Sequence, residues 1–327
     1  MSISRRRFSQ SALAGAGLTA LPLTSRAAEP AFQISLAQWS LHRSFFGDSL
    51  TMGWEKFGQA FTEAPDSVLR GPLDPLDLAT IARRDFDIDA IEYVNTFYFG
   101  RARDDGYMNQ LRQRADDAGV RSLLIMCDRL GATGAADAGT RAQVVESHRP
   151  WLAAAARLGC RAVRVNAYGE GDRIELASRV ADTLHQLGEL AERLNLSVLV
   201  ENHGGLSSDG SWLVGVIESA DHPRVGSLPD FGNFRLSPRG AETEQHYDRY
   251  LGVAELMPYA RAVSAKSYDF DGAGEETTID FQRMLEIVAG AGYSGYVGIE
   301  YEGRRLSEAD GILATKRLLE RVRATLG

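Results

Sequence analysis

The chain alternates eight times between a short apolar run and a longer amphipathic segment. The apolar runs, each predicted to be a β-strand, lie at residues 33–38, 90–93, 121–126, 162–166, 197–201, 226–228, 262–265 and 296–300. Segments with apolar residues at helical spacing separate them, at 76–84, 107–118, 142–158, 174–194, 211–219, 242–256, 280–289 and 307–326. Strands that alternate with helices indicate a parallel sheet, and eight such units predict a single (β/α)8 TIM barrel.

An open, doubly wound sheet is the alternative arrangement for such a pattern. It usually carries a Gly-rich phosphate loop directly after its first strand. Here the first strand continues into Trp39-Ser40-Leu41-His42, which has no glycine. The barrel is therefore favoured, and the long connection at 43–72 is expected on its functional face, as a lid or a subunit contact.

The first 28 residues are typical of an export signal. Ser4-Arg5-Arg6-Arg7-Phe8 is a twin-arginine pattern, a weakly apolar stretch follows at 12–23, and Ser25-Arg26-Ala27-Ala28 offers small residues for cleavage. Together they predict a Tat signal at 1–28 and a mature barrel domain at 29–327 in the periplasm. The apolar stretch is too short to span a membrane, so no membrane span is expected.

The net charge disfavours nucleic acid and anionic lipid as partners, and the positions of the cysteines disfavour a disulfide. The chain has a formal net charge of -8, which becomes -12 when the arginines of the signal are removed. Such a surface repels nucleic acid and anionic lipid. Cys127 and Cys160 fall at opposite ends of neighbouring predicted strands, roughly 15–20 Å apart, so both are predicted to be buried and unpaired.

Four carboxylates fall at predicted strand ends. Glu201 ends one strand, Asp230 follows the next, and Glu300 and Glu302 close the last. In a parallel barrel these ends meet at one face, where active sites form. Acids gathered there repel each other unless a cation or shared protons hold them, which indicates a metal site.

Four motifs appear in chain order: Glu201-Asn202-His203-Gly204-Gly205, Pro229-Asp230-Phe231-Gly232-Asn233-Phe234, Ser264-Ala265-Lys266-Ser267-Tyr268-Asp269-Phe270 and Gly298-Ile299-Glu300-Tyr301-Glu302-Gly303. With them the chain resembles the xylose-isomerase-like TIM-barrel family, often called sugar phosphate isomerases and epimerases, over residues 34–326. The resemblance implies a divalent metal ion (Mn, Mg, Zn or Co) held by side chains from strands five to eight.

The metal ligands implied by the resemblance are Glu201, Asp230 and Glu300. The fourth position departs from the family pattern, because the usual His-x-Lys of strand seven reads Ser264-Ala265-Lys266 here. Two alternatives stay open: His203 supplies the missing nitrogen, or the ammonium of Lys266 lies where a metal would sit and no metal binds. Three oxygen ligands with water still suit Mg or Mn.

The resemblance also implies proton transfer next to a carbonyl. Glu201 and Glu300 are the candidate pair for passing the proton, and Lys266 is a candidate acid whose proton affinity a nearby cation would lower. The candidate substrate-binding residues are Glu92, Asn166, Asn202, His203, Asn233, Tyr268 and Glu302. Arg164 is expected inside the barrel, where it would neutralise the acids.

Export predicts an unphosphorylated substrate, because phosphorylated sugars are kept in the cytoplasm. The first hypothesis is an isomerase or epimerase of a free sugar or keto-sugar, with a homo-oligomer possible. The alternatives are a lyase that cleaves a 3-keto-glycoside by β-elimination and a non-catalytic periplasmic sugar-binding barrel. A metal-dependent nuclease is disfavoured, since the chain has six histidines, one of them near the predicted site, and no basic groove is expected.

Overall fold

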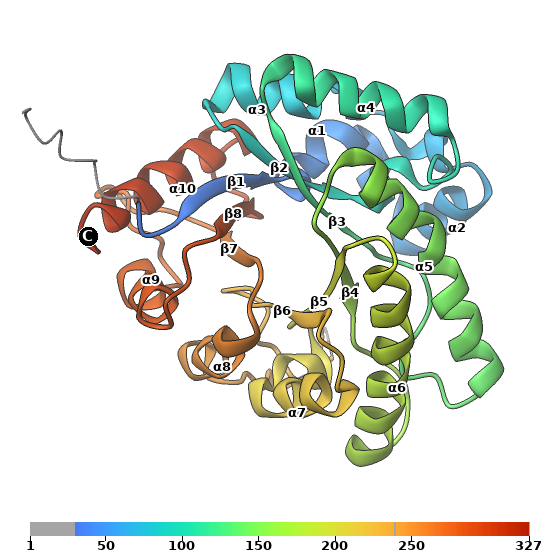
Figure 1. Ribbon diagram of the computed structural model, residues 1–327. Helices are drawn as coiled ribbons and strands as arrows, with labels where there is room; N and C mark the ends of the chain where they lie inside the picture. Colours follow the sequence, from blue (N-terminus) through green and yellow to red (C-terminus); the bar gives the residue numbers. More distant parts are fainter. Residues whose placement is uncertain (1–29, 239, 327) are drawn as a thin grey trace, which may run out of the picture.

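The computed structural model describes residues 30–238 and 240–326, so the predicted signal at 1–28 lies outside the described residues. Eight parallel strands form one curled sheet with the order β6-β5-β4-β3-β2-β1-β8-β7. Helices surround the strands on the outside (Figure 1). The strands are β1 Gln33–Ala37, β2 Ala90–Val94, β3 Arg121–Met126, β4 Ala162–Asn166, β5 Ser197–Glu201, β6 Val225–Leu228, β7 Val263–Ser267 and β8 Tyr296–Tyr301.

The two edge strands of the sheet, β6 and β7, meet without a continuous ladder. Isolated parallel bridges join Ser227 to Ala260 and Asp230 to Ser264. Backbone N–H groups of Arg261 and Ser264 donate across this seam to the Ser227 and Pro229 carbonyls, at 3.1 and 2.9 Å. The predicted TIM-barrel fold is thus confirmed in its eight parallel strands, while the sheet is interrupted at this seam.

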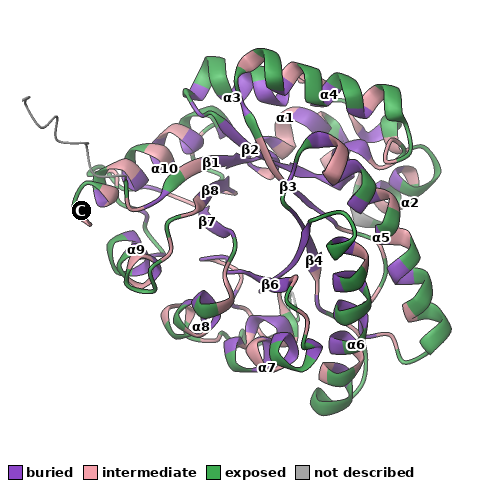
Figure 2. Ribbon diagram, viewed as in Figure 1, coloured by how far each residue is buried: buried purple, intermediate pink, exposed green. Residues whose placement is uncertain are grey.

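The helices cover the outer face of the sheet and turn their buried sides toward it (Figure 2). The α-helices are α1 His42–Phe46, α2 Trp54–Glu63, α3 Leu78–Phe86, α4 Asp105–Ala118, α5 Ala138–Leu158, α6 Arg173–Glu192, α7 Gly210–Ala220, α8 Arg249–Leu256, α9 Phe281–Gly290 and α10 Glu308–Arg323. Short 3-10 helices are η1 Gln38–Leu41, η2 Gly47–Met52, η3 Pro65–Val68, η4 Pro75–Asp77, η5 Asn95–Tyr98, η6 Gly205–Ser208 and η7 Met257–Tyr259. None of the described helices is both long and apolar enough to cross a membrane.

Side chains that cap helix N-termini fix where the outer helices begin. Asp172 accepts hydrogen bonds from the N–H groups of Ile174 and Glu175 at the start of α6. Asp248 does the same for α8, so this helix begins at Arg249 and not at residue 242 as the apolar spacing predicts. The residues before it form an antiparallel bridge between Arg235 and His246, an alternative that spacing alone does not reveal.

Strand side chains divide between an apolar outer layer and a polar interior. On β4, Val163 and Val165 are fully buried among the helices, and Arg164, which alternates with them, lies inside the barrel. Parallel register places Asn166 beside Glu201 and Lys266 beside Glu300. The functional side chains thus come from neighbouring strand ends. Both cysteines are buried and unpaired, as predicted.

The connection from β1 to β2 is held over the carboxyl ends of the strands. The buried carboxylate of Glu308, at the start of α10, accepts hydrogen bonds from the N–H groups of Arg43 and Ser44, at 2.7 and 2.9 Å. Trp39 and Phe46 of this connection pack against each other and against Phe97 of η5. This arrangement fits the predicted lid position, anchored by the last helix of the chain.

Candidate active site

Three buried carboxylates meet where β5, β6 and β8 end. Glu201 is the last residue of β5, Asp230 follows β6, and Glu300 lies in β8. One carboxylate oxygen of each lies within 4.8 Å of the others, and all three side chains are buried. The structure therefore brings together the three acids that the resemblance implies as metal ligands.

The hydroxyl of Ser264 bridges two of these acids. Its Oγ lies 2.8 Å from Asp230 Oδ2 and 2.9 Å from Glu300 Oε2. A hydroxyl has one proton, so it can donate to one of the two carboxylates at a time. The second contact then needs a proton on Asp230 or Glu300, or a cation beside them.

Lys266 supplies a buried positive charge next to the same acids. Its Nζ donates to Glu300 Oε1 at 2.6 Å and to Glu302 Oε1 at 2.9 Å, and lies 3.8 Å from Asp230 Oδ2. Burial lowers the pKa of Lys266, but the carboxylates of Glu300, Glu302 and Asp230 together raise it well above its usual value. With these carboxylates around it Lys266 is an ammonium, and the lowering of its proton affinity by a bound cation stays a prediction.

The positive charges of Arg164 and Lys266 do not fully offset the effect of burial on the acids. Burial raises the pKa of Glu201 to about 7, against the opposing effect of Arg164. Burial also raises the pKa of Asp230 to about 7, against the effect of Lys266. Carboxylates with such pKa values bind protons or cations readily near neutral pH.

The donor atoms of the acidic cluster determine whether a divalent ion fits this site. Glu201, Asp230 and Glu300 present hard oxygen donors at one point, as Mg and Mn prefer. The Ser264 hydroxyl, which touches two of them, lies where the resemblance leads one to expect histidine. The donor set therefore fits a divalent ion held by three carboxylates with positions left for other oxygens.

Arg164 and Asp128 belong to the site, although neither stood among the predicted catalytic or binding residues. Arg164 Nη1 donates to Asp128 Oδ1 at 2.6 Å, and its Nε lies 2.7 Å from Glu201 Oε2. Burial raises the pKa of Asp128, but Arg164, His203 and the hydrogen bond from Asn166 together lower it to about 2. The predicted interior position of Arg164 is confirmed. Arg164 and Asn166 lie two residues apart on β4 and therefore point to the same side of the strand, which was the signal for it.

Two predicted substrate-binding amides are engaged with the protein in this structure. Asn166 Nδ2 donates to Asp128 Oδ1 at 2.8 Å. Asn202 Oδ1 accepts from the N–H of Asp230 at 2.8 Å, and its Nδ2 donates to the carbonyls of Asp230 and Asn233. Asn202 thus fixes the loop that carries Asp230.

Asn233 and Glu92 approach the acids from two sides. Asn233 Nδ2 donates to Glu201 Oε1 at 3.0 Å. Glu92 lies deeper in the barrel, where its Oε1 accepts from Ser35 Oγ at 2.6 Å and its Oε2 has no partner in the described structure. Burial raises the pKa of Glu92 to about 7. Its carboxyl packs against Gly298, where a Cβ would lie 2.4 Å from Oε1.

The remaining predicted residues line the rim of the site. Lys266 lowers the pKa of Glu302 to about 2, against the effect of burial, and the Glu302 side chain is 30% exposed. Tyr268 Oη and Lys266 pack against Gly232, where a Cβ would lie 2.6 Å from Oη. His203 is exposed in the loop after β5 and does not join the cluster of possible ligand atoms.

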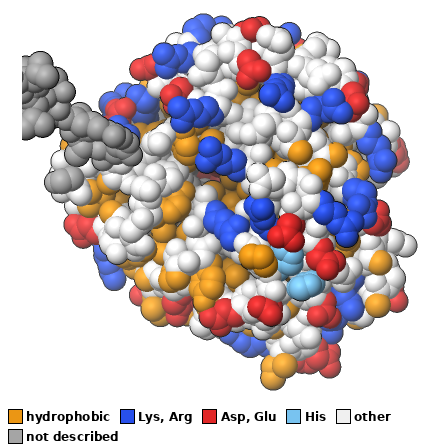
Figure 3. All heavy atoms as spheres, in the orientation of Figure 1, with side chains coloured by type: hydrophobic (Ala, Val, Ile, Leu, Met, Phe, Trp, Pro, Cys, Tyr) orange, Lys and Arg blue, Asp and Glu red, His pale blue; other side chains and the backbone are white. Residues whose placement is uncertain are grey.

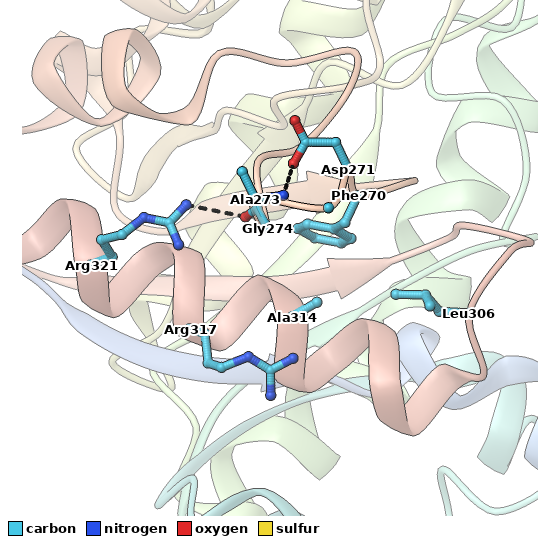
Figure 4. Close-up of a pocket in the computed structure, with 9 residues that line it drawn as sticks. Phe270, Asp271, Ala273, Gly274, Leu306, Ala314, Arg317 and Arg321 are labelled. Carbon is cyan, nitrogen blue, oxygen red and sulfur yellow. Dashed lines mark hydrogen bonds between the residues drawn. The ribbon is translucent and has the colours of Figure 1, made fainter.

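Two surface grooves lie outside this site. One, of about 460 Å³, lies between the loop at 270–274 and α10, and includes Arg317 and Arg321 (Figure 4). The other, of about 510 Å³, lies between α6 and α7. Basic and acidic side chains are interspersed on the face in Figure 3, with no single-sign field over it. Because both grooves lie outside the acidic cluster, the catalytic candidates are the residues at the strand ends.

Comparison with known proteins identifies the class. A family model described as Xylose isomerase-like TIM barrel matches residues 82–323. The chain belongs to this family, as the motifs at the strand ends predict. The 3'-dehydrocarminate deglycosidase alpha subunit from a Microbacterium species is 24% identical over 281 residues, which cover 63% of this chain and 76% of that protein.

Solved structures share the fold. The 3-keto-D-glucoside 4-epimerase from E. coli superposes with a TM-score of 0.61 at 16% identity, and the match covers 76% of this chain and 95% of that one. A xylose isomerase-like TIM barrel protein from Mycobacterium smegmatis, solved in complex with magnesium, gives a TM-score of 0.55 at 18% identity, over 76% of this chain and 89% of that one. At these identities the likeness establishes the fold alone.

Proposed function

We propose that this protein is an enzyme that moves a proton next to the carbonyl of an unphosphorylated sugar or keto-sugar, as an isomerase or epimerase. One observation carries the proposal: Glu201 and Glu300, two buried carboxylates on different strands, meet beside the buried ammonium of Lys266. A raised carboxylate pKa near 7, as at Glu201, suits a general base at neutral pH.

The residues of the chain divide the work of such a reaction. One of Glu201 and Glu300 removes the proton from the carbon next to the carbonyl, and the other returns a proton to the opposite side. Lys266 donates a hydrogen bond to the oxygen on which negative charge develops. A divalent ion held by Glu201, Asp230 and Glu300 would, when bound, polarise the substrate's carbonyl and hydroxyl oxygens.

A lyase acting on a 3-keto-glycoside is the second candidate. The relative named as a deglycosidase favours it. The same proton removal next to the carbonyl would be followed by loss of the leaving group at the β position, whose bonding electrons depart with it. Product analysis separates the two reactions, because epimerisation conserves the mass of the sugar and elimination splits it.

Location remains part of the proposal. The twin-arginine pattern at 5–7 supports export to the periplasm, and an exported enzyme would meet free sugars or glycosides. Fractionation of cells that express the full chain tests this point. Mature protein found only in the cytoplasm would contradict it.

The central experiment follows proton exchange directly. The protein is incubated with methyl 3-keto-β-glucoside in heavy water, and NMR records deuterium uptake at the carbons next to the carbonyl. We expect uptake with the wild type and a loss of about 100-fold or more in Glu201→Gln and in Glu300→Gln. Glu189→Gln, on the exposed side of α6, is the matched control and should exchange at the wild-type rate.

The outcomes of this experiment separate the candidates. Uptake without cleavage of the glycoside supports an epimerase, and release of methanol with loss of the proton next to the carbonyl supports the lyase, with or without uptake. Saturable sugar binding with neither uptake nor methanol release, also after addition of Mn, Mg, Zn or Co, would sink both enzymatic candidates and leave the sugar-binding barrel.

Elemental analysis tests the metal. We expect about one divalent ion per chain after reconstitution, and its loss in Asp230→Asn, because that change removes one of three charged ligands. Ser264→His restores the residue that the family pattern implies and should tighten binding. If neither variant changes the metal content, the cluster does not hold the ion.

A further inference from the structure

The backbone of Asp128 is clamped in the same way as that of Asp230. Asn95, directly after β2, accepts from the Asp128 N–H at 2.8 Å and donates to the Asp128 carbonyl at 2.9 Å. Asn202, directly after β5, makes the same two bonds to Asp230, at 2.8 and 2.9 Å. Each aspartate stands two residues beyond the end of its own strand, β3 or β6. The chain therefore fixes Asp128 as firmly as it fixes a member of the acidic cluster.

The two oxygens of the Asp128 carboxylate differ in their surroundings. Oδ1 accepts from Arg164 Nη1 at 2.6 Å and from Asn166 Nδ2 at 2.8 Å. Oδ2 accepts no hydrogen bond from the described residues, and the Asp128 side chain is 23% exposed. With a pKa of about 2, this carboxylate is ionised at neutral pH. An anionic oxygen is thus available to a donor from outside the protein.

Glu308 shows how a carboxylate with a purely structural task differs. Its two oxygens accept from the backbone N–H groups of Arg43 and Ser44, and its side chain is 4% exposed. Asp128 instead commits one oxygen to the protein and leaves the other accessible. Charge balance with Arg164 explains the first oxygen but gives no reason for the second.

A single guanidinium separates Asp128 from the proposed reacting groups. Arg164 Nε lies 2.7 Å from Glu201 Oε2, while Nη1 of the same side chain donates to Asp128. The strand register places Asn166, the second donor to Asp128, beside Glu201. Two hydrogen-bond lengths and one guanidinium make a span comparable to a sugar ring. A sugar bound at Glu201 therefore reaches the free oxygen of Asp128.

We propose that Asp128 is a specificity-determining residue whose Oδ2 accepts a hydrogen bond from one hydroxyl of the sugar. The inference rests on the proposed function, in which the carbon next to the carbonyl lies between Glu201 and Glu300. The selected hydroxyl then lies away from that carbon, on the side of the ring that faces β3 and β4. A fixed, charged acceptor discriminates against a ligand without the hydroxyl, because its own loss of water is then not compensated.

The test removes single hydroxyls from a sugar that does not react. Calorimetry measures binding of methyl β-glucoside and of its 2-deoxy, 4-deoxy and 6-deoxy analogues to the full-length protein. We expect one analogue to bind the wild type about tenfold or more weakly than the parent sugar, and Asp128→Asn to bind these two within about twofold of each other. Asp105→Asn, at an exposed aspartate paired with Arg157, is the matched control and should keep the wild-type preference.

Further outcomes separate recognition from structure. Equal losses for all four sugars in Asp128→Asn would overturn the proposal, because they indicate that Asp128 only balances the charge of Arg164. Binding of every analogue to the wild type within about twofold of the parent would also overturn it, and this result does not depend on the folding of a variant. Asn95→Ala keeps the carboxylate but removes its clamp, and should reduce the preference for the hydroxyl without abolishing it.

The binding result is independent of catalysis. If the wild type exchanges no proton with keto-sugars but shows the Asp128-dependent preference, the role of Asp128 in sugar recognition stands and the proposed reaction fails. If exchange occurs and Asp128→Asn loses the same factor for all four sugars, the proposed reaction stands and the role of Asp128 is overturned.

Discussion

At the scale of single residues, the site shows how burial and register change what a side chain does. The strand-end position of Glu201, Asp230 and Glu300 was readable from the sequence, because parallel strands end on one face. The bridging role of Ser264 was not readable, since it depends on side chains from β6 and β8 that meet only in the folded barrel.

Glu92 gives a prediction about pH and stability. Burial raises its pKa from an ordinary 4.5 to about 7. The folded state therefore binds this proton more tightly than the unfolded chain, so the stability it contributes is complete below about pH 4.5 and is lost as pH rises toward 7. Glu92→Gln should leave stability unchanged near pH 4.5 and raise it by about 1–3 kcal/mol at pH 8.

Urea unfolding of both proteins from pH 4.5 to 8 measures this difference. Glu189→Gln, an exposed control, should follow the wild type at every pH. Because Glu201 and Asp230 titrate over the same range, the informative quantity is the difference between wild type and variant. A variant that parallels the wild type throughout would show that Glu92 is ionised in the folded protein.

At the scale of elements, the helix pattern was predicted well where the chain itself defines the helix ends. Asp172 caps α6 close to the predicted start at residue 174. The anchoring of α1 was not predictable, because its N-terminal N–H groups are bonded by Glu308, more than 260 residues away in the chain. Local signals say nothing about a cap that another helix supplies.

Glu308 is therefore expected to hold the lid. Glu308→Ala removes the acceptor for the N–H groups of Arg43 and Ser44 and for Ser44 Oγ, and should cost about 2–3 kcal/mol in the free energy of unfolding. Glu320→Ala, which breaks a surface pair with Lys316 on the same helix, should cost less than about 0.5 kcal/mol.

Hydrogen exchange locates the effect of the same substitution. Amides at 42–63 should exchange faster in Glu308→Ala, while those of β4 and β5 keep their wild-type rates. Uniform acceleration across the protein would mean that Glu308 supports the whole fold and not the lid.

At the scale of the whole molecule, eightfold alternation predicted the architecture, because only the number and order of units are needed for it. The interruption between β6 and β7 could not be predicted from the sequence, since the apolar runs of these two strands look like those of the other strands. At this seam two isolated bridges replace a ladder.

The seam is predicted to open more easily than the rest of the sheet. Amides of Arg261 and Ser264, which donate across it, should lose protection before those of Val198 and Val200 within the β4–β5–β6 ladders. Exchange followed by mass spectrometry measures this with peptides from 258–266 and 197–201. Equal protection of the two would show that the bridges hold as firmly as a ladder.

The pairing of β1 with β8 and the contact of α1 with Glu308 also set an order of events during synthesis. Of the described strands β1 leaves the ribosome first, yet its neighbour on one side, β8, spans Tyr296–Tyr301 and the anchor of its following helix is Glu308. Non-local contacts of this kind form late. The barrel therefore waits for these residues before β1 gains its second neighbour, so a ribosome that stalls near residue 295 would carry a chain with an unpaired strand edge, open to chaperones or aggregation.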